Sequence, residues 1–90
     1  MERVIVTVVG KNRIGVLAEV TGAIGSLRGN ILDISQKMMQ DYFNLIMLVE
    51  IGEIETEFVA FKDRLEELGA ASGFKVSVQH ERVFTYMHRI

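Results

Sequence analysis

The sequence predicts an α+β fold with elements in the order β-α-β-β-α-β. Two segments carry apolar residues at intervals of three and four, which is helical spacing, and four others are β-branched or alternate between apolar and polar. Glycine or asparagine separates most of these segments, as expected where a chain without proline must turn. With right-handed crossovers, this order gives a four-stranded antiparallel sheet with both helices on one face, the ferredoxin-like arrangement.

The first predicted strand, at about residues 3–9, is apolar on both faces. Its apolar residues are Val4, Val6 and Val8 on one face and Ile5 and Val9 on the other. This pattern is typical of a central strand that is covered on both sides. Because one layer of helices covers only one face of a sheet, we expect the second face to be covered by another subunit or a ligand.

The first helix is expected from residue 14 or 15 to Arg28. Its apolar stripe consists of Leu17, Val20, Ile24 and Leu27. Gly29 is placed for the left-handed position that ends many helices. Gly22 and Gly25 lie inside the helix, where each costs about 0.5–1 kcal/mol relative to alanine. They indicate either a neighbouring helix that approaches closely or two tolerated glycines.

Residues 30–40 and 43–51 are predicted to form a hairpin around Gln40-Asp41-Tyr42. The second of these strands alternates with a period of two, and the first does so less cleanly. The first is expected to place Leu32, Ile34 and Met38 on one face, and Ile31, Asp33, Ser35, Lys37 and Met39 on the other. Such a mixed pattern is typical of an edge strand that is partly exposed or paired with another chain.

The second helix is expected at about residues 55–72, ended by Gly73 and followed by a strand at 74–79. Its apolar stripe consists of Phe58, Phe61, Leu65 and Leu68. Residues 81–89 place Val83, Phe84 and Met87 at helical spacing, which predicts a short terminal helix or an ordered tail. We expect a single domain over residues 1–90, with a core at 3–79 and a C-terminal extension at 80–90.

The amino-acid composition argues against several classes of binding partner. The chain has 10 basic and 12 acidic residues, a net charge of −2 and no basic stripe, which argues against nucleic acid. No apolar run approaches the roughly 20 residues that span a bilayer, so we expect no membrane segment and a cytoplasmic protein. Cysteine is absent, so no disulfide supports the fold. Because 49% of the residues are apolar, a homodimer that buries part of this surface is expected.

No catalytic group is predicted. The serines have neither hydrolase glycines nor a histidine nearby in sequence. His80 and His88 are eight residues apart, whereas two metal ligands on one helix face need a spacing of four. Exposed or interface histidines are the favoured interpretation, and we expect no metal and no cofactor.

The best candidate site is the loop Gly10-Lys11-Asn12-Arg13-Ile14-Gly15-Val16-Leu17, between the first strand and the first helix. Free backbone N–H groups at the start of a helix favour a small anion. The alternative is a solvated turn whose glycines serve only backbone geometry.

The segments G-K-N-R-I-G-V-L at 10–17 and G-N-I-L-D-I at 29–34 resemble the ACT domain, the small amino-acid-sensing module of metabolic regulators. The resemblance covers about residues 3–79 and extends to free-standing single-ACT proteins and to one half of the glycine-cleavage repressor. In the ACT module of serine-inhibited phosphoglycerate dehydrogenase, two asparagines contact the amino acid across a dimer interface, and they match Asn12 and Asn30. The implied ligand site comprises Gly10, Lys11, Asn12, Arg13, Ile14, Gly15, Val16, Asn30 and Ile31.

The chemistry of the two asparagines suits an amino acid, because an amide can donate to a carboxylate and accept from an ammonium. Lys11 and Arg13 would attract an anion without contacting it. The dehydrogenase has a histidine where this chain has Gly10, so one contact is lost and serine is not assured as the ligand. Alternatively, both asparagines serve turn geometry.

The favoured hypothesis is a non-catalytic regulatory homodimer that senses an amino acid or carboxylate metabolite at the subunit boundary and acts on a separate protein partner. The first alternative is a dimeric scaffold that binds no ligand. The second is a small ferredoxin-like enzyme such as an acylphosphatase, for which Arg13 and Asn44 are poor matches. RNA binding is disfavoured, because the first strand carries no aromatic residue.

Overall fold

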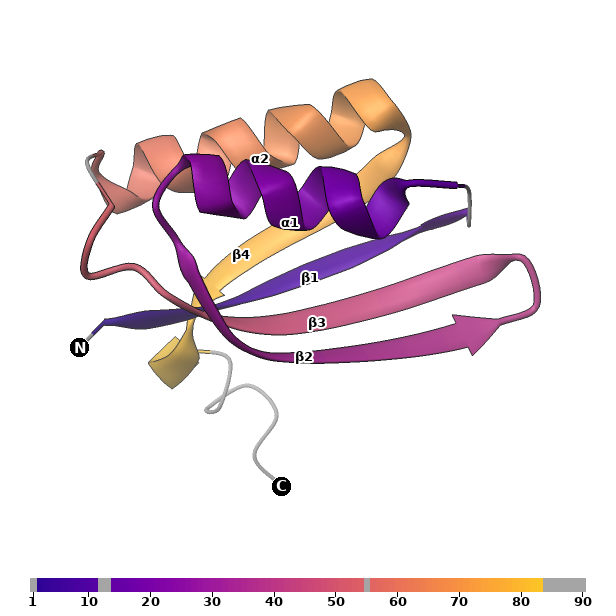
Figure 1. Ribbon diagram of the computed structural model, residues 1–90, viewed down its shortest axis with the longest axis horizontal. Coiled ribbons are helices and arrows are strands. Elements are labelled where there is room, and N and C mark those ends of the chain that lie inside the picture. The colour runs from indigo at the N-terminus through magenta and orange to yellow at the C-terminus, as the bar shows by residue number, and fades with distance from the viewer. Residues whose placement is uncertain (1, 12–13, 55, 84–90) are drawn as a thin grey trace.

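The computed structural model describes residues 2–11, 14–54 and 56–83. Its elements are β1 (Arg3–Lys11), α1 (Val16–Ser26), β2 (Asn30–Met39), β3 (Tyr42–Glu50), α2 (Phe58–Ser72) and β4 (Phe74–His80). A helical turn follows at residues 81–83. The strand order is β2-β3-β1-β4, with every neighbouring pair antiparallel, and both helices lie on one face (Figure 1). The predicted ferredoxin-like fold is confirmed.

The hydrophobic core lies between the two helices and the sheet. Its fully buried members include Val4, Val6 and Val8 of β1, Phe43, Leu45, Met47 and Val49 of β3, Ile24 of α1, and Phe61 and Leu65 of α2. Alternate residues of a strand point to opposite faces, so these β1 and β3 residues form a single buried surface. Most of both predicted apolar stripes lies on this core, with Leu27 and Phe58 half-buried at its margin. Leu68 is half-buried on α2, and Leu17, predicted to belong to the stripe of α1, is instead 40% exposed.

Several element boundaries differ from the predicted ones. β1 continues two residues beyond Val9, because Gly10 and Lys11 still pair with β3. α1 is shorter at both ends than predicted, and α2 begins three residues late, at Phe58. Tyr42 is the first residue of β3, so the hairpin turn is only Gln40-Asp41. The strands thus extend into the predicted loops, and the helices lose residues at their ends. The order of the elements is as predicted.

The end of α1 differs in detail from the prediction. Arg28, not Gly29, takes the left-handed conformation, with φ 67°. The backbone N–H of Gly29 then donates to the carbonyl oxygen of Ile24 at 2.9 Å. Gly29 is required for another reason: a Cβ there would lie 2.8 Å from Cγ2 of Ile24 and 3.1 Å from Cγ1 of Val49. The glycine therefore lets the chain pass close to the core as it enters β2.

A β-bulge in β2 corrects the predicted faces of that strand. Ile31 pairs with Val49 and Asp33 pairs with Leu48, so Leu32 is an extra residue. Ile31 therefore lies on the helix-covered face together with Ile34 and Met38, and not on the opposite face as predicted. The other four residues of the predicted second face do share it, and these are Asp33, Ser35, Lys37 and Met39.

The sheet face that points away from the helices is called the open face below. Its central residues are Ile5, Thr7 and Val9 of β1 and Asn44, Ile46 and Leu48 of β3. Neither helix covers it, as predicted for this side of the sheet, and the helical turn at residues 81–83 lies on this side (Figure 1). Ile5 is nevertheless only 9% exposed. Glu81, in that turn, lines a hollow together with Ile5.

The β2–β3 turn provides a test of backbone strain. Gln40 has φ 55°, a left-handed conformation that costs a side-chain-bearing residue about 1–2 kcal/mol. We expect Gln40→Gly to raise the free energy of unfolding by about 0.5–1 kcal/mol, since part of the relief is lost to the chain entropy of glycine. Gly73→Ala is the matched control. Gly73 has φ 86° and no described atom within 4 Å of a built Cβ, so this change should lower stability by strain alone. Urea unfolding measures both, and two changes of the same sign would contradict the argument.

Candidate functional site

The first candidate segment begins inside the sheet. Gly10 pairs with Phe43 on one side and with Phe74 on the other. The two rings meet edge to face, with centroids 5.5 Å apart. A Cβ at Gly10 would lie 2.8 Å from Cδ1 of Phe74. Gly10 thus makes room for this aromatic pair, and only its backbone is left for a ligand.

The residues before α1 present backbone groups and one cation. Gly15 is the N-cap, with φ 84°, and has no side chain with which to cap the helix. Val16 is 4% exposed and packs in the core, so its backbone N–H, and not its side chain, is available to a ligand. Lys11 and Ile14 are exposed, the latter at 99%. Asn12 and Arg13 lie outside the described residues.

The second candidate segment lies at the opposite end of the sheet. Asn30 is exposed, opens β2 and pairs with Glu50, whereas Gly10 pairs with Phe43. Seven strand residues separate these pairs along β3, which corresponds to roughly 23 Å. Figure 1 shows α1 starting at one end of the sheet and β2 starting at the other. The structure therefore does not bring the two candidate segments together within one chain.

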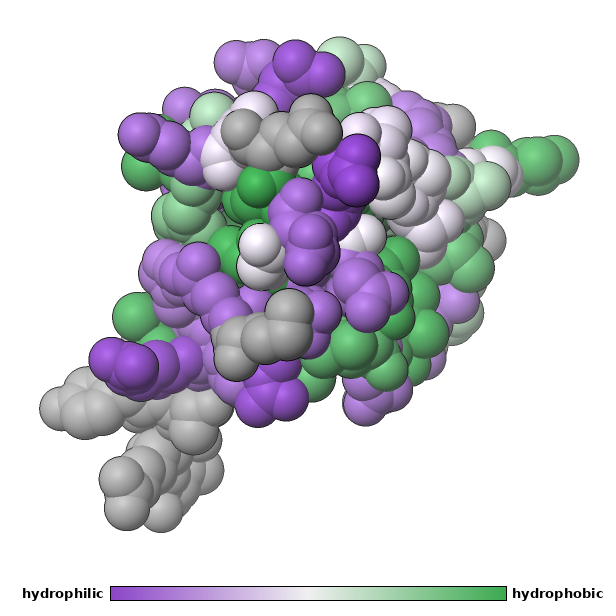
Figure 2. Space-filling model, turned by 60° about the vertical axis from the view of Figure 1, so that its left-hand side comes forward, coloured by the Kyte–Doolittle hydropathy of each residue, from purple (hydrophilic) through white to green (hydrophobic). Residues whose placement is uncertain are grey.

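Exposed apolar side chains flank β2 on its helix side. Leu17 of α1 and Ile34 and Met38 of β2 are 40%, 43% and 47% exposed, and these three residues are called the edge patch. Glu19 accepts a hydrogen bond from Ser72 of α2. Leu17, two residues earlier, projects from the opposite side of α1 and so faces away from α2. Figure 2 shows hydrophobic side chains gathered at the molecular surface, toward its lower right.

The two glycines inside α1 have no close neighbour within the described chain. Gly22 and Gly25 are exposed, and no described atom lies within 4 Å of a Cβ built at either position. The prediction of a closely packed helix is therefore not met by α2. These glycines leave the outer surface of α1 without side chains that would keep another helix at a distance.

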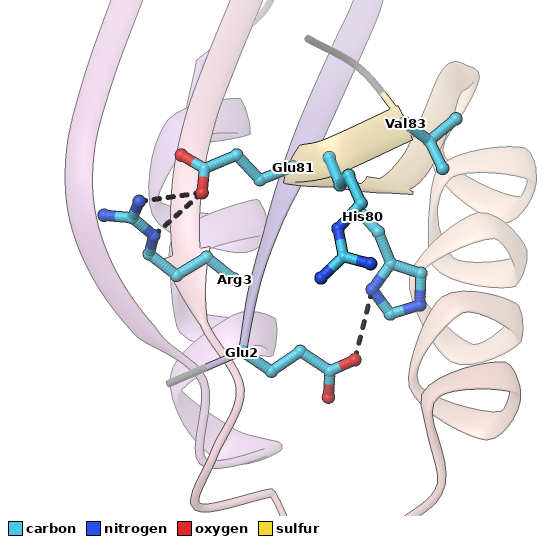
Figure 3. A pocket seen from close by; sticks show the side chains of 6 residues that line it. Glu2, Arg3, His80, Glu81 and Val83 are labelled. Carbon is cyan, nitrogen blue, oxygen red and sulfur yellow. Dashed lines mark hydrogen bonds and ion pairs between the residues drawn. The ribbon is translucent and has the colours of Figure 1, made fainter. Parts of the chain in front are cut away.

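A group of charged residues joins the two ends of the described chain (Figure 3). A hollow of about 420 Å³ is lined by Glu2, Arg3, His80, Glu81, Arg82 and Val83. Arg3 donates to the carboxylate of Glu81 through Nη2 at 2.7 Å and Nε at 3.0 Å. These two contacts hold the 81–83 turn against β1.

His80 belongs to the same group. Its Nδ1 lies 3.2 Å from a carboxylate oxygen of Glu2, and its ring stacks on Phe58 of α2 with centroids 4.1 Å apart. Its side chain is 37% exposed, as expected for a histidine outside the core. His88 lies outside the described residues. The stacking was not predictable, because Phe58 and His80 belong to different periodic patterns.

A family comparison identifies the fold. The family model described as the ACT domain matches residues 2–79. The chain belongs to the ACT domain family. A UPF0237 protein of Methanococcus maripaludis is 48% identical to this ACT domain over 90 residues, all of both chains. The match to this relative continues through residues 80–90, which lie beyond the family model.

Solved structures agree with this assignment. An ACT domain protein from Streptococcus pneumoniae is 32% identical, has a TM-score of 0.81 and covers 92% of this chain and 93% of its own. A protein described as a putative glycine cleavage system transcriptional repressor has a TM-score of 0.73 over 88% of this chain and 45% of its own. At 22% identity, the latter similarity concerns the fold alone. Among the described helices, none is long and apolar enough to cross a membrane.

Proposed function

We propose that this ACT domain is a non-catalytic regulatory module that binds an amino acid or related carboxylate metabolite between two copies of the chain. The observation that carries the proposal is the position of the two candidate segments. They lie at opposite ends of the same side of the molecule, where α1 and the edge strand β2 run.

A twofold axis through β2 would reverse the second copy end for end. Antiparallel pairing of the two β2 strands then sets the loop before α1 of one copy beside Asn30 of the other. Because the operation is symmetric, two equivalent sites form. One chain supplies half of each site, which explains why a single copy does not bring the segments together.

The surface around β2 supports this arrangement. β2 is an edge strand whose free backbone groups can extend the sheet. The edge patch of Leu17, Ile34 and Met38 would be buried, as large exposed apolar groups at interfaces usually are. The exposed glycines of α1 would let the two copies of this helix lie close together.

The groups offered at such a site suit a zwitterion. Backbone N–H groups at the start of α1 and the amide of Asn12 can donate to a carboxylate. The amide of Asn30 can accept from an ammonium and donate to a carboxylate. Lys11, exposed at the end of β1, raises the local concentration of anions. Ligand binding across the boundary stabilises one dimer arrangement, which a separate protein partner can then recognise.

A thermal-shift screen of the twenty amino acids and common carboxylate metabolites tests the proposal. A ligand at a hundredfold its dissociation constant adds about 2.7 kcal/mol, and each kcal/mol raises Tm by about 4–8 °C in a chain of this size. We expect the shift to vanish in Asn12→Ala and in Asn30→Ala. Asn44→Ala, an exposed asparagine on the open face, should retain it.

Other results of the same screen separate the alternatives. A folded dimer that responds to none of these compounds would refute the sensor and leave the scaffold. A ligand that stabilises all three variants equally would place its site elsewhere on the molecule.

A further inference from the structure

The charges on the open face are divided between its two ends. At the end where β1 begins, Asp33 of β2 and Glu50 of β3 point to this face, and Glu81 reaches it from the turn. Arg3 lies at the same end, where it is paired with Glu81. The strand residues that point to this face at the opposite end include three exposed lysines, Lys11, Lys37 and Lys75. The open face is therefore acidic at one end and basic at the other.

Between these two ends the open face is largely apolar. Ile46 of β3 is 39% exposed near the middle of the face. Together with Ile5 and Leu48 it lines a hollow of about 240 Å³, and Asp33 and Glu81 add two carboxylates to the lining. Such a hollow suits a lysine side chain, because the four-carbon stem can pack on apolar surface while the ammonium group stays beside the carboxylates.

We propose that two dimers stack through their open faces, with the facing chains reversed end for end. The inference rests on the dimer proposed above, in which two β2 strands pair, and the occupant of each open face is a second copy of this chain. A twofold axis between the faces, crossing the strands at the paired residues Ser35 and Ile46, sets the acidic end of each copy over the basic end of the other.

This axis makes definite pairs of residues face each other. Ile46 meets its own copy on the axis. Lys37 of each copy lies over Asp33 of the other, beside the hollow, because both residues are two positions from Ser35. Lys11 comes over the Arg3–Glu81 ion pair, whose own charges cancel.

The other possible twofold axis runs along the strands and is disfavoured by the same charges. It would set like ends over each other and turn β2 of one copy onto β4 of the next. Lys37 and Lys75 lie at the same level of the sheet, since Asn44 and Val9 connect them through the strand register. These lysines would then face each other, and like charges across an interface oppose association.

The size of the open face explains why stacking would require the β2 pairing. Four strands about 4.8 Å apart, over a length of about seven residues, present roughly 450 Å² per chain. One pair of faces thus buries roughly 900 Å², which is less than the roughly 1,200 Å² at which specific interfaces begin. Two pairs bury roughly 1,800 Å², so a β2-paired dimer stacks where a single chain does not. A ligand that strengthens the β2 pairing therefore also strengthens the tetramer.

Sedimentation velocity of the full chain tests the proposal. We expect the parent chain to form tetramers, and Ile46→Lys to reduce them to dimers, because two like charges would meet on the axis. Ile46 is exposed in the single chain, so this change leaves the core intact. Val59→Lys, at a position that is 61% exposed on α2, is the control and should leave the tetramer unchanged.

A charge exchange tests the predicted orientation. Lys37→Glu should raise the dissociation constant of the tetramer at least about tenfold, because it sets two carboxylates against each other. Adding Asp33→Lys should restore most of this loss, since the ion pair re-forms with its charges exchanged. The carboxylate of Asp33 accepts a hydrogen bond from the backbone N–H of Ile34 at 2.8 Å, so circular dichroism checks that the exchanged chain keeps its fold.

The outcomes separate this inference from the dimer on which it rests. A parent chain that is a dimer, and that Ile46→Lys leaves a dimer, would overturn the stacking while the β2 pairing stands. A folded charge-exchanged chain that fails to regain the tetramer would overturn the proposed orientation. A parent dimer that resists Ile34→Lys with Met38→Lys, but becomes monomeric with Ile46→Lys, would overturn the β2 pairing and with it the stacking of paired dimers.

Discussion

Gly69→Ala should destabilise this ACT domain strongly, although it replaces a helix glycine with the best helix former. Gly69 is buried where α2 crosses β4. A Cβ there would lie 2.4 Å from Cγ2 of Val76 and 3.0 Å from the carbonyl oxygen of Phe74. A side chain can rotate away but a backbone oxygen cannot, so α2 must move off the sheet.

We expect a net loss of about 1–2 kcal/mol, because overpacking at the tight end costs about 2–3 kcal/mol and the gain in helix propensity offsets about 1 kcal/mol of it. That loss corresponds to a fall in Tm of roughly 10 °C. Urea or thermal unfolding followed by circular dichroism measures it. An increase of about 1 kcal/mol, as helix propensity alone predicts, would contradict the close approach.

A double change separates the clash from other effects. Val76→Ala removes the methyl group nearest to the added Cβ, so Gly69→Ala should cost less in that background. The coupling free energy should exceed about 1 kcal/mol, which is measurable in a double-mutant cycle. Strictly additive losses would show that the contact with Val76 is not the cause.

The periodic parts of the fold were predictable from the sequence. Alternation in residues 43–51 and the stripe of Phe61 and Leu65 fixed β3 and α2, because burial on one face requires those periods. The β2 faces were not predictable in the same way. A single extra residue at Leu32 shifts the alternation, and only pairing with β3 reveals it. The conformation of Arg28 escaped prediction for a related reason: glycine is the usual residue there, but Gly29 was already required for close packing.

For the candidate site, too, local features were predictable and contacts between distant residues were not. Local signals identified the loop at 10–17 and the start of β2, each with an asparagine. No local signal could tell that Gly10 serves the Phe43–Phe74 pair, since that role depends on a contact between distant strands. The proposal of a site shared by two copies rests on the strand order and the register.

The double change Ile34→Lys and Met38→Lys should abolish the proposed dimer while leaving the fold intact. Both residues are more than 40% exposed in the single chain, so lysine is accommodated there without entering the core. In a twofold dimer each lysine occurs twice, and like charges meet near the axis. Such juxtaposition costs several kcal/mol. We expect the dissociation constant to rise by at least about a hundredfold, at about 1.4 kcal/mol for each factor of ten.

Sedimentation velocity over a range of concentrations measures this effect, and Val59→Lys is the control. Val59 is 61% exposed on α2, away from β2, and its replacement should leave the dimer unchanged. The doubly substituted chain should also lose its response to the ligand found for the parent chain, because each site needs Asn30 from a second copy. A monomer that still binds the ligand would refute the shared site, since one chain would then suffice. A dimer that survives both lysines would place the interface away from β2.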